Sequence, residues 1–132
     1  MNKIEFLKNT IADDPRNAFA YFALAREYLK VNDRGKAREC YETLVQHFPD
    51  YGGTYYHYAL LLLQEDEPQA ATDIINQGID VLRKANDTHL LSELRALRNQ
   101  MMEEWLYLAI KYTNCRADQP DIFKFISHQF KP

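Results

Sequence analysis

Residues 21–49 read YFALAREYLKVNDRGKARECYETLVQHFP, and large and small side chains recur there at helical spacing. Their order is the one expected of two packed helices. The positions are Tyr21, Leu24, Ala25, Tyr28, Ala37, Tyr41 and Pro49. Adding 34 to each number keeps the size class in six of the seven cases, at Tyr55, Tyr58, Ala59, Leu62, Ala71 and Ile75, whereas Arg83 replaces the proline. A helical hairpin is therefore repeated at this fixed interval.

This repeat resembles the tetratricopeptide repeat, with tyrosine at the usual tryptophan position and alanine at the usual glycine position. Subtracting 34 lands on Leu7 and Pro15, so residues 3–16 look like the second half of an earlier unit. Adding 68 lands on residues that no longer follow the pattern: His89, Ser92, Glu93 and Ala96. The resemblance covers about residues 3–85, and it implies an all-α protein built as an α-α superhelix of hairpins.

The domain organisation expected from these repeats is one helical domain over residues 1–114. It consists of a half repeat at 3–16, full repeats at 18–51 and 52–85, and a capping helix at 87–113. Residues 115–132 fit no repeat and form a C-terminal extension, with a short amphipathic helix predicted at 120–129.

The composition agrees with a single helical domain. The chain has 132 residues, 46% of them hydrophobic, with only 4 glycines and 5 prolines. The net charge of −3 disfavours binding to nucleic acid or to an anionic membrane surface. Residues 1–105 carry 12 Lys and Arg against 17 Asp and Glu, whereas residues 106–132 carry 4 against 2, so the net charge changes sign at about residue 105.

Local chemistry predicts where the helices begin and end. Asn17 and Asp33 are good helix N-caps, and Asn32-Asp33 forms the turn between a helix ending near residue 31 and one ending near 48. The run PDYGG at 49–53 breaks the chain. A helix follows at 54–64, and the next begins at Pro68 and ends near Asn86.

Small residues in these helices are expected where neighbouring helices approach closely. Ala25, Ala37, Ala59 and Ala71 occupy such positions, and Gly78 fits the same need despite a helix-propensity cost of about 1 kcal/mol. Beyond Asp87, apolar residues recur every three or four positions, which predicts one stripe of a long helix that covers the end of the array. The stripe is Leu90, Leu94, Leu97, Met101, Trp105 and Leu108.

No pattern of catalytic or metal-binding residues stands out. The four histidines form no helical zinc pair, and no glycine-rich phosphate loop is present. Cys40 and Cys115 match no metal or redox spacing, which is typical of reduced thiols in a cytoplasmic protein. The N-terminus lacks the apolar run of a signal peptide, and no segment is long enough to span a membrane. We therefore expect neither an enzyme nor a bound cofactor or metal.

A binding surface remains, and the resemblance implies where it lies. In this family the first helix of each hairpin lines the concave side of the superhelix, where protein segments dock. The first repeat is expected to place Phe19, Phe22, Arg26 and Lys30 there, and the second Tyr56, His57, Leu60 and Gln64. This lining is aromatic and apolar, with a few polar groups at its edges.

Two interpretations of this surface stay open. In the first, the protein is a scaffold or adaptor that holds a protein or peptide partner. Some family members grip a C-terminal carboxylate with Lys, Asn and Arg; the matching positions here hold Phe22, Arg26, His57, Asp87 and Leu91. Only Arg26 pairs readily with a carboxylate, so an apolar segment suits the surface better. In the second, the aromatic face is buried by the extension or by a second copy in a homodimer.

Overall fold

The computed structural model describes residues 2–113 and is all-α over that range. The predicted short helix at 120–129 and the extension lie outside the described residues. Six helices follow one another along this part of the chain: α1 (Lys3–Asp13), α2 (Ala18–Lys30), α3 (Arg34–His47), α4 (Gly53–Gln64), α5 (Pro68–Ala85) and α6 (Thr88–Thr113). The predicted helix boundaries are confirmed to within one or two residues.

Polar side chains begin most of the helices, as the sequence indicates. The side-chain oxygens of Asn17 and Asp33 accept hydrogen bonds from the backbone N–H of Ala20 and Lys36, at 3.1 and 3.2 Å. Each bond satisfies one of the free N–H groups of a first helical turn. Helix α5 instead starts with a proline at its first position, where no N–H is needed.

The turns after α2, α4 and α5 share one geometry. Each places a single residue in the left-handed region, at Asn32 (φ 60°), Asp66 (φ 60°) and Asn86 (φ 56°). The next N–H then bonds the carbonyl five residues earlier, as from Asp33 to Tyr28 at 2.8 Å. Asn32 and Asp66 are separated by one full repeat, so the backbone recurs at the interval found in the side chains.

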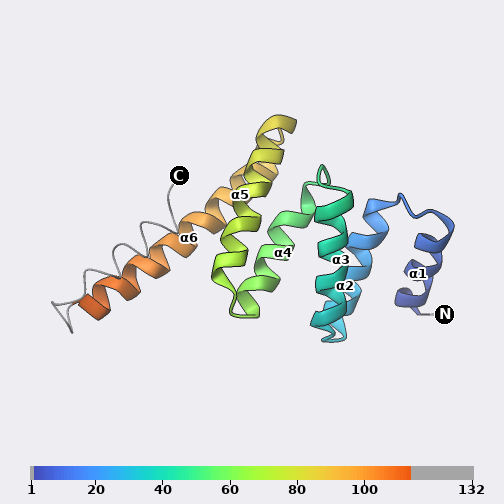
Figure 1. The fold of residues 1–132 in the computed structure, drawn as a ribbon, viewed down its shortest axis with the longest axis horizontal. Helices are drawn as coiled ribbons and strands as arrows, with labels where there is room; N and C mark the ends of the chain where they lie inside the picture. The colour runs from blue at the N-terminus through green and yellow to red at the C-terminus, as the bar shows by residue number, and fades with distance from the viewer. Residues whose placement is uncertain (1, 114–132) are drawn as a thin grey trace.

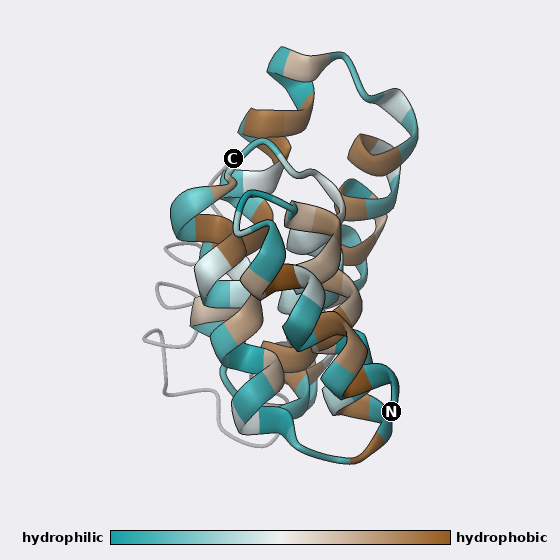
Figure 2. Ribbon diagram, turned by 90° about the vertical axis from the view of Figure 1, so that its right-hand side faces the viewer, coloured by the Kyte–Doolittle hydropathy of each residue, from teal (hydrophilic) through white to brown (hydrophobic). Residues whose placement is uncertain are grey.

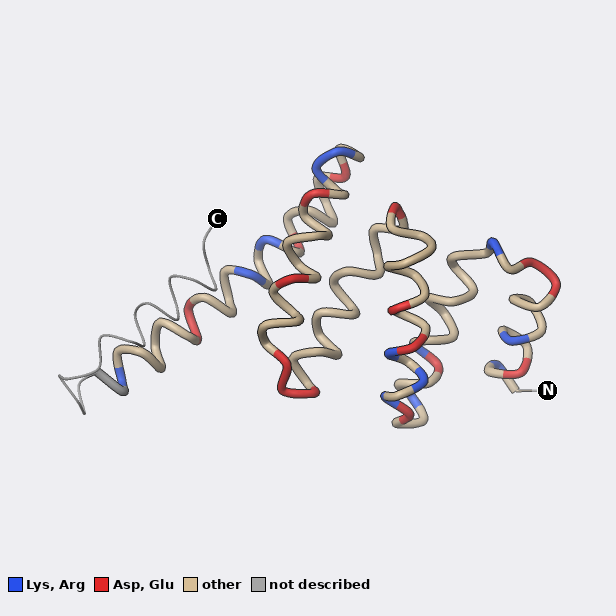
Figure 3. Tube along the Cα trace, viewed as in Figure 1, with Lys and Arg blue, Asp and Glu red and all other residues tan. Residues whose placement is uncertain are grey.

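The helices stack mainly as neighbours in the chain (Figure 1). Helix α2 packs on α3, α4 on α5, and α6 on α5 and α4, while α1 packs on α2. Apolar and polar segments alternate along much of the helical ribbon in Figure 2, as expected of amphipathic helices. Figure 3 shows that α4 carries no Lys, Arg, Asp or Glu, which suits a helix flanked by α3, α5 and α6.

The small residues lie where the helices approach most closely. Ala25, Ala37, Ala59 and Ala71 have no exposed surface. A Cβ atom built on Gly78 would lie 2.6 Å from Cβ of Tyr55 and 2.8 Å from Cδ1 of Leu94, so only glycine fits there without movement. Gly78 is therefore a packing glycine, as the sequence predicts.

The long helix α6 only partly follows its predicted stripe. Leu94, Leu97 and Met101 are buried, but Leu108 is 42% exposed, so its placement on the packed side was wrong. The reason is length: 26 residues span about 39 Å, and the 18 residues of α5 only about 27 Å. The C-terminal part of α6 therefore projects past the hairpins, as Figure 1 shows.

Candidate functional site

Side chains from α2 and α4 meet on one side of the array. The ring of His57 lies edge-on to Phe22 at 5.1 Å between centroids, and Tyr56 lies edge-on to His57 at 5.6 Å. The guanidinium carbon of Arg26 is 5.9 Å from the centre of the Phe22 ring, which is a cation–π distance. We call Phe22, Arg26, Tyr56 and His57 the aromatic face.

Helix geometry explains why these residues come together. Phe22 and Arg26 are four positions apart and share one side of α2. Tyr56 stands one full repeat after Phe22, so it occupies the same position on α4, the first helix of the next hairpin. Equivalent sides of successive hairpins lie next to each other in a stacked array. The face is therefore a direct product of the repeat.

The other four predicted residues surround this centre without joining its ring contacts. Leu60 is half-buried and packs against the core. Phe19 is 63% exposed. Lys30 is exposed and pairs with Glu27 of its own helix at 3.0 Å, and Gln64 is exposed at the end of α4.

Two residues near the face were not predicted from the sequence. Tyr51 packs against Phe22 with ring centroids 5.6 Å apart, although it belongs to the loop before α4. Loop residues have no periodicity that would assign them to a face. Glu93 of α6 acts electrostatically on His57. The sequence could not assign Glu93 to this face, because residues near it no longer follow the repeat pattern, even though the next residue, Leu94, is buried.

A cavity of about 220 Å³ continues the face toward α6. Tyr56 forms its α4 wall, and Glu93, Ala96, Leu97 and Gln100 form its α6 wall. The candidate site therefore extends over three helices, from Arg26 on α2 through Tyr56 on α4 to Gln100 on α6. Its middle is aromatic, a cation lies at one end and a carboxylate at the other.

Burial is the main cause that lowers the pKa of His57 below its ordinary 6.5. The positive charge of Arg26 lowers it further, and the carboxylate of Glu93 acts in the opposite direction. The imidazole is therefore neutral at pH 7 and has one N–H donor and one nitrogen acceptor.

Arg26 forms no ion pair with any residue from 2 to 113, so its charge is available to a ligand.

The lowered pKa of His57 predicts a loss of stability in mild acid. As the pH falls through 6.5, the unfolded chain takes up a proton at residue 57 that the folded chain does not, so the free energy of unfolding decreases. His57→Gln should remove this part of the pH dependence. Urea unfolding at pH 7.5 and 5.5 measures it as the difference between the two proteins.

His47→Gln is the matched control, because His47 lies at the end of α3, outside the aromatic face. It measures how much a histidine-to-glutamine change outside the face alters the pH dependence, and the change in His57→Gln should exceed it. Equal pH dependence in wild type and His57→Gln would contradict the assignment.

The described residues do not assemble into a chemical centre. No group of three or more His, Cys, Asp or Glu within residues 2–113 is placed to hold a metal ion. Burial raises the pKa of the Cys40 thiol to about 11, so it is protonated and a poor nucleophile at neutral pH. No helix of this part of the chain is long and apolar enough to cross a membrane. The arrangement is suited to binding.

The repeated stacking of helical hairpins identifies the chain as a helical-repeat protein. Comparisons with known proteins lead to the same class. The model of the Suppressor of forked protein (Suf) family matches residues 2–93. A crystal structure of a tetratricopeptide repeat domain protein from Salinibacter ruber is 39% identical, with a TM-score of 0.59, over 62% of this chain and 91% of that one. A solution NMR structure of such a protein from the same organism is 40% identical, with a TM-score of 0.61, over 64% and 85%. No curated protein matches the sequence.

The chain therefore belongs to the Suf family of tetratricopeptide-like helical repeats. This confirms the resemblance found over about residues 3–85. The fold is that of a protein-interaction repeat domain. Folds of this type generally serve as non-enzymatic scaffolds.

Proposed function

We propose that this protein is an adaptor that binds a segment of another protein on its aromatic face. The observation that supports this most is the position of Arg26, which forms no ion pair within residues 2–113, beside a cluster of half-buried rings. Aromatic and arginine side chains contribute a large share of the binding energy in protein interfaces. The proposed binding residues are those predicted from the sequence: Phe19, Phe22, Arg26, Lys30, Tyr56, His57, Leu60 and Gln64.

The chemistry of the face indicates what kind of segment it would hold. Apolar side chains of the partner would pack on Phe22 and Tyr56, since α4 presents no charged residue. An acidic residue of the partner would pair with Arg26, and the neutral His57 would exchange hydrogen bonds with its backbone. We therefore expect an apolar segment with a carboxylate near one end.

The same observations support a non-catalytic role in the cytoplasm. The aromatic face brings together no nucleophile, base and orienting group. Cys40 is a free thiol, which suits a reducing compartment. We propose no cofactor and no metal for this site.

The test is affinity capture from cells with wild type and the double variant Phe22→Ala/Tyr56→Ala. Any partner bound through the face should be reduced at least about tenfold, because losing two aromatic anchors costs more than about 1.4 kcal/mol. Phe6→Ala/Tyr107→Ala is the matched control: it removes the same residue types from exposed positions on α1 and α6. Arg26→Glu adds a surface variant that reverses the charge proposed to pair with the partner's carboxylate, and it also removes the cation–π contact with Phe22.

Partners retained by Phe22→Ala/Tyr56→Ala, or lost equally from the control, would overturn the proposal. Circular dichroism melts of each variant separate lost binding from lost folding.

The alternative proposal is self-association through the aromatic face. It is favoured by Phe19, which is 63% exposed beside the aromatic face, because exposed apolar side chains of this kind often mark interfaces. Light scattering on the capture variants distinguishes the two proposals. A wild-type dimer that becomes monomeric in Phe22→Ala/Tyr56→Ala would favour self-association, and a wild-type monomer that captures a protein favours the adaptor.

A further inference from the structure

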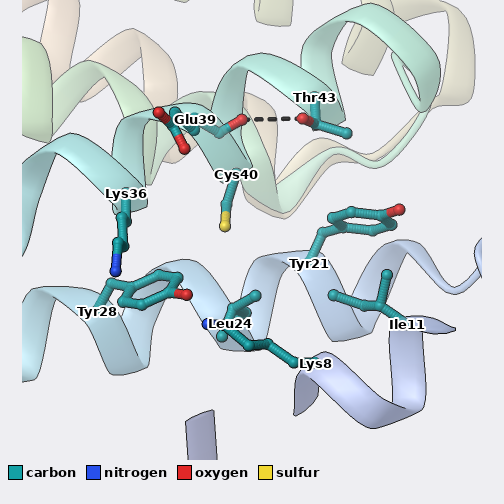
Figure 4. A pocket seen from close by; sticks show the side chains of 9 residues that line it. All are labelled: Lys8, Ile11, Tyr21, Leu24, Tyr28, Lys36, Glu39, Cys40 and Thr43. Atoms are coloured by element: carbon teal, nitrogen blue, oxygen red, sulfur yellow. Dashed lines mark hydrogen bonds between the residues drawn. The ribbon is translucent and has the colours of Figure 1, made fainter. Parts of the chain in front are cut away.

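A second hollow lies on the other side of α2. Its lining includes Tyr21, Leu24 and Tyr28, whereas Phe22 and Arg26 belong to the aromatic face. At about 100° per residue, the two sets point in roughly opposite directions from the helix axis. The hollow has a volume of about 420 Å³, is open to the surface, and is lined by residues of α1, α2 and α3 (Figure 4). It is separate from the proposed protein-binding face.

The floor of this hollow is apolar, and a comparison of residue sizes between the two repeats partly explains why the hollow exists. Leu24 and Cys40 are buried there, and the equivalent residues of the next repeat are the larger Tyr58 and Ile74. The sulfur of Cys40 points into the space between α3 and α2 in Figure 4. Tyr28, which is larger than its counterpart Leu62, forms a wall. The first repeat therefore has smaller side chains than the second at positions 24 and 40, although it has a larger one at position 28.

The rim carries more positive than negative charge. Lys8 on α1 and Lys36 on α3 line the hollow, and Glu39 is the one acid among its lining residues. Lys36 lies 5.6 Å from the Tyr28 ring centre and 3.8 Å from the carboxylate of Asp33. Lys8 forms no ion pair with the part of the chain from residue 2 to 113. An apolar floor with an unpaired ammonium at its edge complements an amphiphilic anion.

We propose that this hollow binds a small amphiphilic anion, a ring system or short apolar chain that carries one negative charge. The apolar part contacts Leu24, Tyr28 and Cys40, and the anionic group pairs with Lys8. The volume lies within the range of about 300–1,000 Å³ that is typical of small-ligand pockets, which are mostly apolar with a few polar groups that fix orientation. This site is independent of the proposed adaptor function, because it uses the opposite side of α2.

The experiment titrates the full chain with 1-anilinonaphthalene-8-sulfonate and follows its fluorescence. N-phenyl-1-naphthylamine, the same ring system without the sulfonate, is the matched probe. Lys8→Glu should weaken binding of the sulfonate about 3- to 10-fold, which corresponds to the loss of one partly exposed ion pair, and should leave the neutral probe unchanged. Lys3→Glu, with the same charge change on the same helix but outside the hollow, should bind both probes like wild type.

A filled variant tests the position of the apolar part. Leu24→Tyr/Cys40→Ile introduces the residues that the second repeat holds at these positions and should reduce binding of both probes at least about tenfold. Filled protein that is folded and binds like wild type would overturn the proposal. If the filled variant does not fold, the lysine pair decides: equal affinity of Lys8→Glu and Lys3→Glu for the sulfonate overturns it.

Discussion

Leu94→Ala is expected to lower the free energy of unfolding by about 2–5 kcal/mol, because truncating a fully buried leucine leaves a cavity. Leu94 is 1% exposed and lies where α6 meets α5, against Gly78. Helix α6 buries its apolar surface mainly in its first half, at Leu94, Leu97 and Met101, so losing the Leu94 contact should weaken the packing of the last helix. Urea unfolding followed by circular dichroism measures the change.

Leu108→Ala is the matched control on the same helix. The sequence pattern places both leucines on one stripe, but Leu108 is 42% exposed. Its truncation should change stability by less than about 0.5 kcal/mol. Equal losses from Leu94→Ala and Leu108→Ala would show that α6 packs along its whole length, contrary to the structure described above.

Gly78→Ala is expected to destabilise the protein by about 1–3 kcal/mol, although alanine is the better helix former by about 1 kcal/mol. The added methyl group would lie 2.6 Å from Cβ of Tyr55, which cannot move without shifting α4. Helix α5 would therefore be pushed away from α4. Thermal melting followed by circular dichroism measures the effect.

The matched control is Gly35→Ala, the same substitution on α3. A Cβ atom there has its nearest neighbour, the Oδ1 atom of Asp33, at 3.9 Å, which is an ordinary van der Waals distance. We expect no loss and a gain of up to about 1 kcal/mol. A Gly78→Ala protein as stable as Gly35→Ala would mean that α4 and α5 are not in close contact at this point.

The sequence was sufficient to predict the architecture because the fold is local and repetitive. Each hairpin is determined by side-chain size at seven positions and by capping residues such as Asn17 and Asp33, all within a single repeat. The extent of packing along α6 could not be predicted in this way. Leu94 and Leu108 are equivalent in periodicity, and only the length of the neighbouring α5 distinguishes them.

The candidate site was predictable only where it obeys the repeat. Phe22 and Tyr56 occupy equivalent positions, so the interval brings them to one face. Tyr51 lies in a loop and Glu93 in a helix without the repeat pattern, and their approach to Phe22 and His57 depends on how the segments pack. The hollow behind α2 depends on differences between the repeats, as at Leu24 and Tyr58, which a search for similarity does not reveal.

The three left-handed turns bear on the entropy of the unfolded chain. All four glycines lie outside the left-handed region, and Asn32, Asp66 and Asn86 occupy it instead. A residue with a Cβ atom samples fewer backbone conformations than glycine when the chain is unfolded, so less freedom is lost when these corners form. Asparagine and aspartate tolerate this conformation at little cost. A small protein with few glycines therefore loses less conformational entropy on folding, and its packing has less of this cost to offset.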